Sequence, residues 1–228
     1  MRIKFLLNNG DYRTESFKNF IKESFPQLLT EKNPELYLVA GGDGAMLHAI
    51  KDTIDDGIPY LGKAMGTFNF LLNKFDDDKE MINRLLNDEI KIEKFDSNAI
   101  IAYLDDKKLG EAVNDVILGE RLMDYYNFSI STESGDFTNF EFKGSGLCIS
   151  TPIGSTAFNY NNNGRILPLN LNSDFLSITG VVTNRFLNDI VPFEDISIKS
   201  SGANIYLIDN VGKLNEGSEL ILKKGSKI

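Results

Sequence analysis

The chain has 228 residues, of which 42% are hydrophobic and 25% are charged, close to the average of globular proteins. This composition excludes a disordered chain, a collagen and a coiled coil. The net charge of −9 argues against a non-specific binder of nucleic acid or anionic membranes, because such proteins present a basic face. A phosphate-bearing ligand would then be held by backbone N–H groups, a metal ion or a few local cations.

Targeting signals are absent from the sequence as we read it. The apolar start of the chain is broken at Asn8, before it reaches the length of a signal sequence. No apolar run approaches the ~18 residues of a transmembrane helix. The single cysteine, Cys148, cannot form an intramolecular disulfide and suits a reducing compartment. We therefore expect a cytoplasmic protein that contacts neither membrane nor nucleic acid.

The first part of the chain alternates short apolar strands with helices. Strands are predicted over 3–7, 36–40 and 58–61, and the helices follow Thr14, Gly44 and the acidic run at 76–78. Thr14 is a candidate helix cap. The acidic run suits a helix N-terminus, and a metal cluster is its other reading. The alternation predicts an α/β domain with a parallel sheet over residues 1–95.

The second part of the chain has a different period. Short strands separated by Gly, Asn and Asp turns predict an all-β domain over residues 96–228. The expected strands are 99–104, 112–118, 125–132, 137–142, 147–150, 175–178, 196–199, 204–208 and 219–223.

The strongest motif is Gly41-Gly42-Asp43-Gly44, between a predicted buried strand and a helix. Glycines let backbone N–H groups approach a phosphate at a helix N-terminus, so Gly41, Gly42 and Gly44 are candidate phosphate-binding residues. A carboxylate would repel phosphate, so Asp43 would instead meet a hydroxyl or a magnesium ion, as phosphoryl transfer to a sugar hydroxyl requires. The alternative is a tight turn in which Asp43 caps the next helix.

Two further motifs offer polar groups in apolar surroundings. The segment from Gly144 to Phe158 runs from a strand into a loop with several hydroxyls, which could contact a ribose or a phosphate, or form a β-turn rich in hydroxyls. Asn114 and Asp115 interrupt an apolar stretch, so one of them could bind a ligand at a strand edge. A satisfied buried turn is the alternative.

Together with the segment 66–70 (GTFNF), these motifs resemble the NAD kinases, which phosphorylate the 2′-hydroxyl of the adenosine ribose of NAD. The family pattern has a GGDGT loop, a GHLGF-like segment, an NE pair and a long GDGLxxSTPTGSTAY segment. Order and spacing agree over residues 36–165. The long segment is specific, whereas GGDG is shared with lipid kinases and phosphofructokinases.

The resemblance implies an NAD kinase/diacylglycerol kinase-like fold, with an active site between the α/β domain and a β-sandwich-like domain. It implies that Asp43 accepts the proton of the 2′-hydroxyl. The other positions that it assigns to NAD binding are Gly44, His48, Asn114, Asp115, Lys143, Ser145, Thr156, Ala157, Phe158 and Asn161. His48 has a solvated helix position as its alternative.

The resemblance also implies partners for the chain. ATP or polyphosphate would be the phosphoryl donor, a divalent cation, Mg²⁺, the cofactor, and a homodimer or homotetramer the assembly. In such an assembly Thr183, Asn184 and Arg185 would contribute to a neighbour's NAD site.

Several positions depart from the family pattern. Ala45 replaces a threonine, Ser145 an aspartate, Phe158 a tyrosine, and Asp115 a glutamate. Thr67 and Asn69 replace the histidine and the second glycine of GHLGF. None of these changes removes Asp43. They motivate a second hypothesis, a non-catalytic dinucleotide-binding oligomer. A lipid kinase is disfavoured, because no apolar or basic membrane-binding stretch is present.

Overall fold

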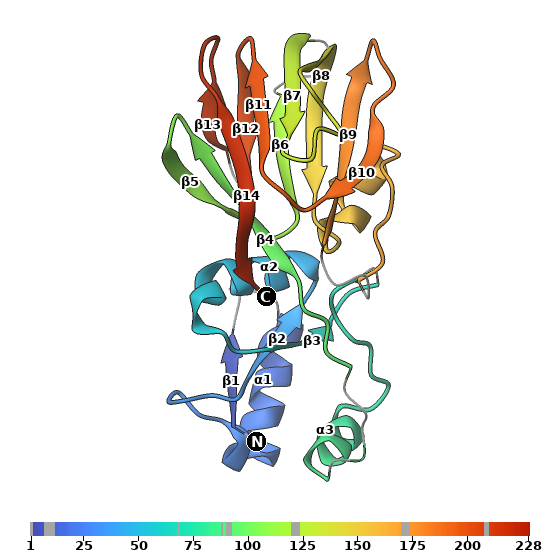
Figure 1. The fold of residues 1–228 in the computed structure, drawn as a ribbon. Coiled ribbons are helices and arrows are strands. Elements are labelled where there is room, and N and C mark those ends of the chain that lie inside the picture. The colour runs from blue at the N-terminus through green and yellow to red at the C-terminus, as the bar shows by residue number, and fades with distance from the viewer. Residues whose placement is uncertain are drawn as a thin grey trace. The chain divides into compact units, whose positions relative to one another are not determined.

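The computed structural model describes residues 2–6, 12–67, 69–87, 89, 93–119, 124–169, 174–207 and 210–228. They form two compact units, Met1–Lys94 and Phe95–Ile228 (Figure 1). Each unit is described by itself.

The first unit is an α/β fold with a three-stranded parallel sheet in the order β1-β2-β3. Its elements are β1 (Ile3–Leu6), α1 (Tyr12–Ser24), η1 (Pro26–Leu28), β2 (Leu36–Gly41), α2 (Asp43–Thr53), η2 (Ile54–Asp56), β3 (Tyr60–Ala64) and α3 (Asp78–Leu86). The strand predicted to end at Leu7 ends at Leu6, and Leu7 lies outside the described residues.

The core of this unit forms where apolar residues of the sheet meet those of the helices. Ile3 and Leu38 of the sheet pack with Ile21 of α1 and Ile82 of α3, and all four are almost fully buried. Thr14 lies inside α1 and is buried, so the prediction that it caps the helix is wrong.

The acidic run does begin a helix. The side chain of Asp77 accepts a hydrogen bond from the Glu80 N–H at 2.9 Å and caps α3. Asp78 pairs with the buried Lys63 at 2.5 Å. The helix-start interpretation of residues 76–78 therefore agrees with the contacts observed there.

The second unit is an antiparallel β fold whose strands run in the order β13-β12-β6-β8-β7-β11-β14-β4-β5, with β9 joined to β8 and β10 to β9. Its elements are β4 (Asn98–Leu104), β5 (Lys107–Ala112), β6 (Asp115–Gly119), β7 (Tyr126–Thr132), β8 (Phe140–Ser150), η3 (Gly154–Thr156), α4 (Phe158–Asn161), β9 (Phe175–Thr183), β10 (Asn188–Pro192), β11 (Ile196–Ser200), β12 (Ala203–Tyr206), β13 (Asn210–Leu214) and β14 (Leu220–Lys227). The strand predicted to end at Ile208 ends at Tyr206, and Ile208 lies outside the described residues.

Two strand predictions in this unit are wrong in their boundaries. Residues 140–142 and 147–150 of two predicted strands belong to one strand, β8, which begins at Phe140 rather than at Phe137. Its glycines stand where other strands come close: a Cβ on Gly144 would lie 2.7 Å from the Thr183 side chain, and one on Gly146 would lie 2.5 Å from the Leu118 carbonyl oxygen. They serve close packing of strands rather than a turn.

The second error concerns the strand predicted over 112–118. The chain leaves β5 at Ala112 and enters β6 at Asp115, so Val113 and Asn114 form the connection between two strands. The two polar residues at 114 and 115 therefore do not sit side by side within one strand.

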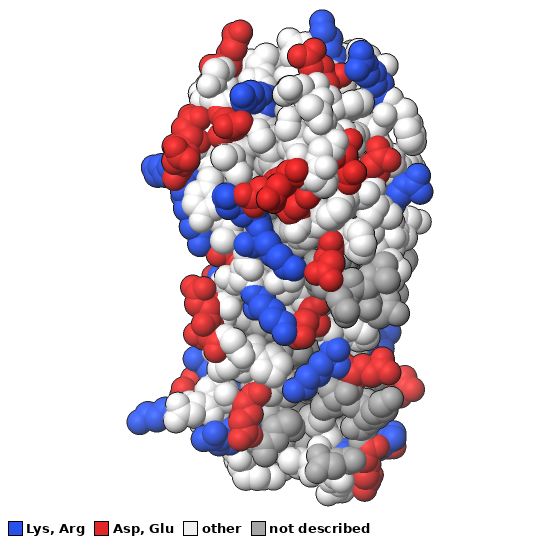
Figure 2. All heavy atoms as spheres, viewed as in Figure 1, with Lys and Arg blue, Asp and Glu red and all other residues white. Residues whose placement is uncertain are grey.

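The surface carries charges of both signs. On the face shown in Figure 2, acidic and basic side chains are interspersed rather than gathered into a basic patch. Among the described residues, no helix combines the length and apolar character needed to cross a membrane.

Candidate active site

The glycine motif forms the turn between β2 and α2 in the first unit. Gly41 ends β2 with φ of +152°, and a Cβ there would lie 2.7 Å from the Cβ of Ala45. Glycine is therefore required at 41 both by the backbone conformation and by the lack of space. Gly42 is the N-cap of α2, and its carbonyl accepts the Ala45 N–H at 2.9 Å.

Asp43 is the first residue of α2, and its half-buried carboxylate is fixed by two backbone donors. Oδ1 accepts from the Leu71 N–H at 2.9 Å and the Phe70 N–H at 3.1 Å, and Oδ2 lies 3.0 Å from the Phe70 nitrogen. Gly42 is the N-cap residue of α2, and the Asp43 carboxylate accepts from Phe70 and Leu71, which lie outside the helix, so the alternative in which Asp43 caps its helix is wrong. The carboxylate instead ties the glycine loop to the segment 66–71.

Two features of that segment were not predicted from the sequence. The backbone donors at Phe70 and Leu71 carry no sequence signal, because any residue type supplies an N–H. The Asn69 side chain donates to the Gly66 carbonyl at 2.9 Å, while its buried Oδ1 has no hydrogen-bond partner among the described residues. Phe68, which belongs to the same motif, lies outside the described residues.

The remaining candidates of this unit are exposed. A Cβ on Gly44 would meet no atom within 4 Å, so the backbone there is open to a ligand. His48 is an exposed residue of α2, and no contact with the described part of the chain distinguishes the phosphate-facing role of its side chain from a solvated position.

In the second unit, Asn114 is held against the loop that follows β8. Its carbonyl accepts the Thr151 N–H at 2.9 Å, and the Thr151 hydroxyl donates to the Val113 carbonyl at 2.7 Å. A Cβ on Gly154 would lie 2.2 Å from the Asn114 carbonyl oxygen, so only glycine fits. Asn114 Oδ1 is buried and has no partner among the described residues, which leaves it free to accept a hydrogen bond from a ligand.

Asp115 lies opposite Ser150 in the pairing of β6 with β8 and is 4% exposed. Burial raises the pKa of its carboxyl to about 6, although hydrogen bonds with Ser150 and Cys148 act in the opposite direction. The Cys148 thiol donates to Asp115 Oδ1 at 3.8 Å, and its pKa is raised by burial and by the neighbouring carboxylate. Asp115 thus faces protein groups within its own unit.

Four of the other predicted NAD-binding residues of the long motif lie on η3, on α4 or, in the case of Ala157, between them. Thr156 and Ala157 are half-buried, Phe158 is 40% exposed and Asn161 is exposed. Asn159, between them, is completely buried and was missed, because a lone asparagine in a polar segment gives no signal of burial.

Ser145 and Lys143 lie farther along β8. Ser145 is 5% exposed, whereas Lys143 is exposed. At ~3.3 Å per residue, Lys143 is roughly 23 Å from Ser150, so the structure does not bring it to the Asn114–Thr151 contact.

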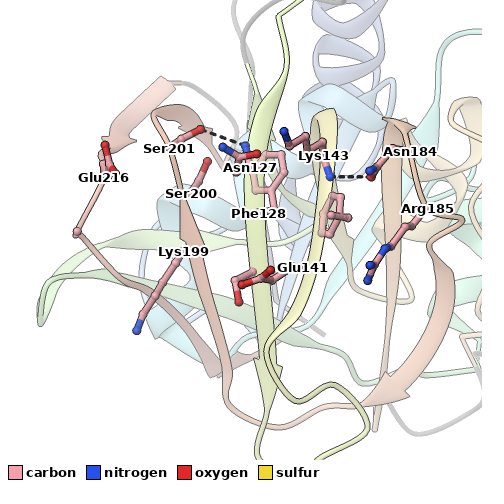
Figure 3. A pocket seen from close by; sticks show the side chains of 13 residues that line it. Asn127, Phe128, Glu141, Lys143, Asn184, Arg185, Lys199, Ser200, Ser201 and Glu216 are labelled. Carbon is pink, nitrogen blue, oxygen red and sulfur yellow. Dashed lines mark hydrogen bonds between the residues drawn. The ribbon is translucent and has the colours of Figure 1, made fainter.

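Lys143 lies instead in a groove of about 530 Å³ on β7, β8 and β11 (Figure 3). The Lys143 N–H donates to Asn184 Oδ1 at 2.8 Å, and the Asn184 N–H donates to the Lys143 carbonyl at 2.9 Å. Arg185 lines the same groove. The structure therefore brings Lys143 together with the segment predicted to serve a neighbouring subunit.

Comparisons with known proteins show which proteins the chain is similar to. No protein-family model matches the sequence. An NAD kinase of Rickettsia canadensis is 30% identical over 186 residues, which cover 79% of this chain and 69% of the relative. An NAD kinase of Hyphomonas neptunium is 29% identical over 145 residues, which cover 61% of this chain and 54% of the relative.

Two solved structures share the fold. Yeast NADH kinase, determined in complex with NADH, superposes with a TM-score of 0.79 at 18% identity over 98% of this chain and 78% of its own. An Archaeoglobus fulgidus NAD kinase in complex with ATP superposes with a TM-score of 0.72 at 14% identity over 100% of this chain and 93% of its own. The predicted fold class, an α/β unit with a parallel sheet followed by an all-β unit, is confirmed.

The identity to the Rickettsia relative extends over more than two thirds of that protein. The motifs quoted from the sequence and both structural likenesses point to the same family. This chain therefore belongs to the NAD kinase family of phosphotransferases.

Proposed function

We propose that this chain forms NADP by transferring a phosphoryl group from ATP or polyphosphate to the 2′-hydroxyl of the adenosine ribose of NAD. The observation that carries the proposal is the fixed carboxylate of Asp43. It stands in a glycine loop at the start of α2, and two backbone N–H groups hold its orientation. Membership of the NAD kinase family supports the choice of acceptor.

In the proposed step, Asp43 accepts the proton of the 2′-hydroxyl as that oxygen attacks the terminal phosphorus. The new O–P bond forms while the bond to the leaving phosphate oxygen breaks, and the leaving group departs with that electron pair. Backbone N–H groups of Gly41, Gly42 and Gly44 would face the donor phosphates. Because the transition state of phosphoryl transfer is loose, positioning supplies much of the rate.

A divalent cation fits this site when it arrives with the donor. Among the described residues, no group of three or more His, Cys, Asp or Glu side chains could hold a resident metal ion. Mg²⁺ in kinases needs only one or two carboxylates, since substrate phosphates and water complete its shell. Among the residues that the structure describes, Asp43 Oδ2 has a single backbone donor, the Phe70 N–H, which leaves room for a cation beside it. Bound Mg²⁺ would neutralise charge on the donor phosphates.

NAD would be recognised by groups of the second unit. We propose that Oδ1 of Asn114, which has no partner among the described residues, accepts a hydrogen bond from a ribose hydroxyl, with Asp115 next to it in the sequence. The half-exposed ring of Phe158 would offer a stacking face, with Thr156, Ala157 and Asn161 around it. Ser145 and His48 would be further contacts to the dinucleotide, whereas Lys143, roughly 23 Å from Ser150 along β8, would not contact the ribose held by Asn114.

A homo-oligomer forms part of the proposal. The β9–β10 region exposes large apolar side chains, with Phe186 84%, Val182 49% and Ile190 45% exposed. Exposed apolar side chains on two paired strands and their connection favour contact with another protein surface. Light scattering should give a dimer or tetramer, and Phe186→Ser should shift the protein toward the monomer. A wild-type monomer at micromolar concentration would contradict the assembly.

The test of the proposed function is the Asp43→Asn variant, which keeps the shape of the side chain but loses the proton acceptor. NADP formation should fall about 10²–10⁴-fold, the usual cost of losing a general base. NAD affinity and the melting temperature should persist. Asp52→Asn is the matched control, because Asp52 is an exposed residue of the same helix. A folded Asp43→Asn protein with wild-type turnover would refute the catalytic role.

A further inference from the structure

Asn159 lies on α4, in the centre of the long motif, and is completely buried. Every hydrogen-bonding position of its side-chain amide is used. Nδ2 donates to the carbonyl oxygens of Ser155 at 3.1 Å and Arg165 at 2.9 Å. Oδ1 accepts from the hydroxyls of Ser177 at 3.3 Å and Thr179 at 2.8 Å. A primary amide has two N–H donors and two acceptor lone pairs, so the group is saturated.

These partners require an amide. Backbone carbonyl oxygens only accept hydrogen bonds, so the NH₂ group must face Ser155 and Arg165. An aspartate at this position would place an oxygen against both carbonyls and bury a charge. An alanine would leave two carbonyls and two hydroxyls without this partner, and buried polar groups without partners are costly.

The loop that follows α4, residues 162–167, also packs against Asn159. The Gly164 N–H donates to the Asn159 carbonyl at 2.8 Å, and a Cβ on Gly164 would lie 1.9 Å from Asn159 Oδ1. The Leu167 N–H donates to the Ser155 hydroxyl oxygen at 3.0 Å. The side chain of Asn159 thus joins η3, the returning loop and β9 at a single point.

We propose that Asn159 is a positioning residue for dinucleotide binding. Through its four hydrogen bonds it fixes the η3–α4 segment on β9, so that Thr156, Ala157 and Phe158 are held in place before the ligand arrives. This inference rests on the proposed function, in which that segment contacts NAD. Preorganisation raises affinity because less ordering remains to be done on binding. Loss of the amide should therefore raise the KM and Kd for NAD and leave kcat nearly unchanged.

The experiment compares wild type, Asn159→Asp and Thr179→Val. The valine variant keeps the shape of Thr179 and removes one of the four hydrogen bonds. It tests the same role if the aspartate variant does not fold. Ile205→Ala is the control. Ile205 is a completely buried residue of β12, outside residues 154–167, so its truncation should destabilise the unit without changing the η3–α4 segment itself. NAD affinity by calorimetry, steady-state kinetics and hydrogen exchange of the amides at 154–167 are measured well below the melting temperatures.

We expect Asn159→Asp to weaken NAD binding about tenfold or more and Thr179→Val about two- to fivefold, with faster exchange at 154–167 in both. Ile205→Ala should leave affinity and exchange in that segment unchanged. Wild-type affinity in both variants, or equal losses in Ile205→Ala, would overturn the positioning role. A wild-type protein that binds no NAD would instead overturn the proposed function itself.

Discussion

Replacing Asp115 by asparagine should stabilise the protein while weakening its binding of NAD. Asp115 is 4% exposed, and burial raises the pKa of its carboxyl from 3.8 to about 6. The folded state therefore binds this proton more tightly than the unfolded chain does. The stability contributed by the proton is complete below pH 4 and is lost as the pH rises past 6.

The size of the effect follows from the pKa difference. A shift of about two units, at 1.36 kcal/mol per unit, corresponds to about 3 kcal/mol between the two limits. About 1.5 kcal/mol of this falls between pH 5 and pH 8, a range that avoids the pI of 4.7. Asparagine has the same shape and is neutral at every pH. The free energy of unfolding of Asp115→Asn, relative to wild type, should therefore rise by that amount from pH 5 to pH 8.

Urea denaturation at pH 5, 6, 7 and 8 measures this difference directly. Asp189→Asn is the matched control, since it makes the same substitution at an exposed residue of the same unit, on β10. A pH-independent difference for Asp115→Asn, or one that falls as the pH rises, would refute the reasoning. NAD affinity measured on the same samples shows whether stability has been gained at the expense of binding.

Two further changes probe the packing of each unit. Asp78→Asn removes the charged partner of the buried Lys63 and should lower the free energy of unfolding by about 1–3 kcal/mol, measured by urea denaturation at pH 7. Lys63→Met in the same background should recover part of that loss. No recovery would contradict the idea that the unpaired charge of Lys63 destabilises the folded state. Gly154→Ala would place a Cβ 2.2 Å from the Asn114 carbonyl oxygen, so the loop must move. NAD affinity should fall, and the free energy of unfolding should drop by about 1–3 kcal/mol. A urea denaturation midpoint equal to that of wild type would contradict this prediction.

The fold class followed from the sequence because it depends on local periodicity. The apolar run at 36–40 and the helical spacing after it are properties of neighbouring residues, and they give β2 and α2. The acidic run at 76–78 predicted α3 for the same reason, since Asp77 caps the helix through the N–H of Glu80, only three residues ahead.

The errors arose where a residue's role depends on distant parts of the chain. The sequence prediction left residues 143–146 between two strands, but β9 at Thr183 and β6 at Leu118 need the space that Gly144 and Gly146 leave in one continuous strand. Similarly, Asp43 could cap its own helix or bind another segment, and only the fold shows that Leu71 supplies the donor.

The candidate site shows the same division. Asp43 and Asn114 were identified from motifs, and the structure gives each a defined environment within its own unit. Asn159 was not identified, because its partners at 177 and 179 lie on a strand that periodicity cannot pair with α4. Burial of a polar residue depends on tertiary packing, and no local pattern encodes it.

The most direct test of the central claim is the identity of the product. Purified protein is incubated with NAD, Mg²⁺ and either ATP or polyphosphate, and the product is analysed by phosphorus NMR and by a dehydrogenase that accepts only NADP. We expect NADP carrying its new phosphate on the 2′-oxygen with at least one of the two donors, and loss of that product in Asp43→Asn. No NADP with either donor, or a phosphate on another oxygen of NAD, would contradict it.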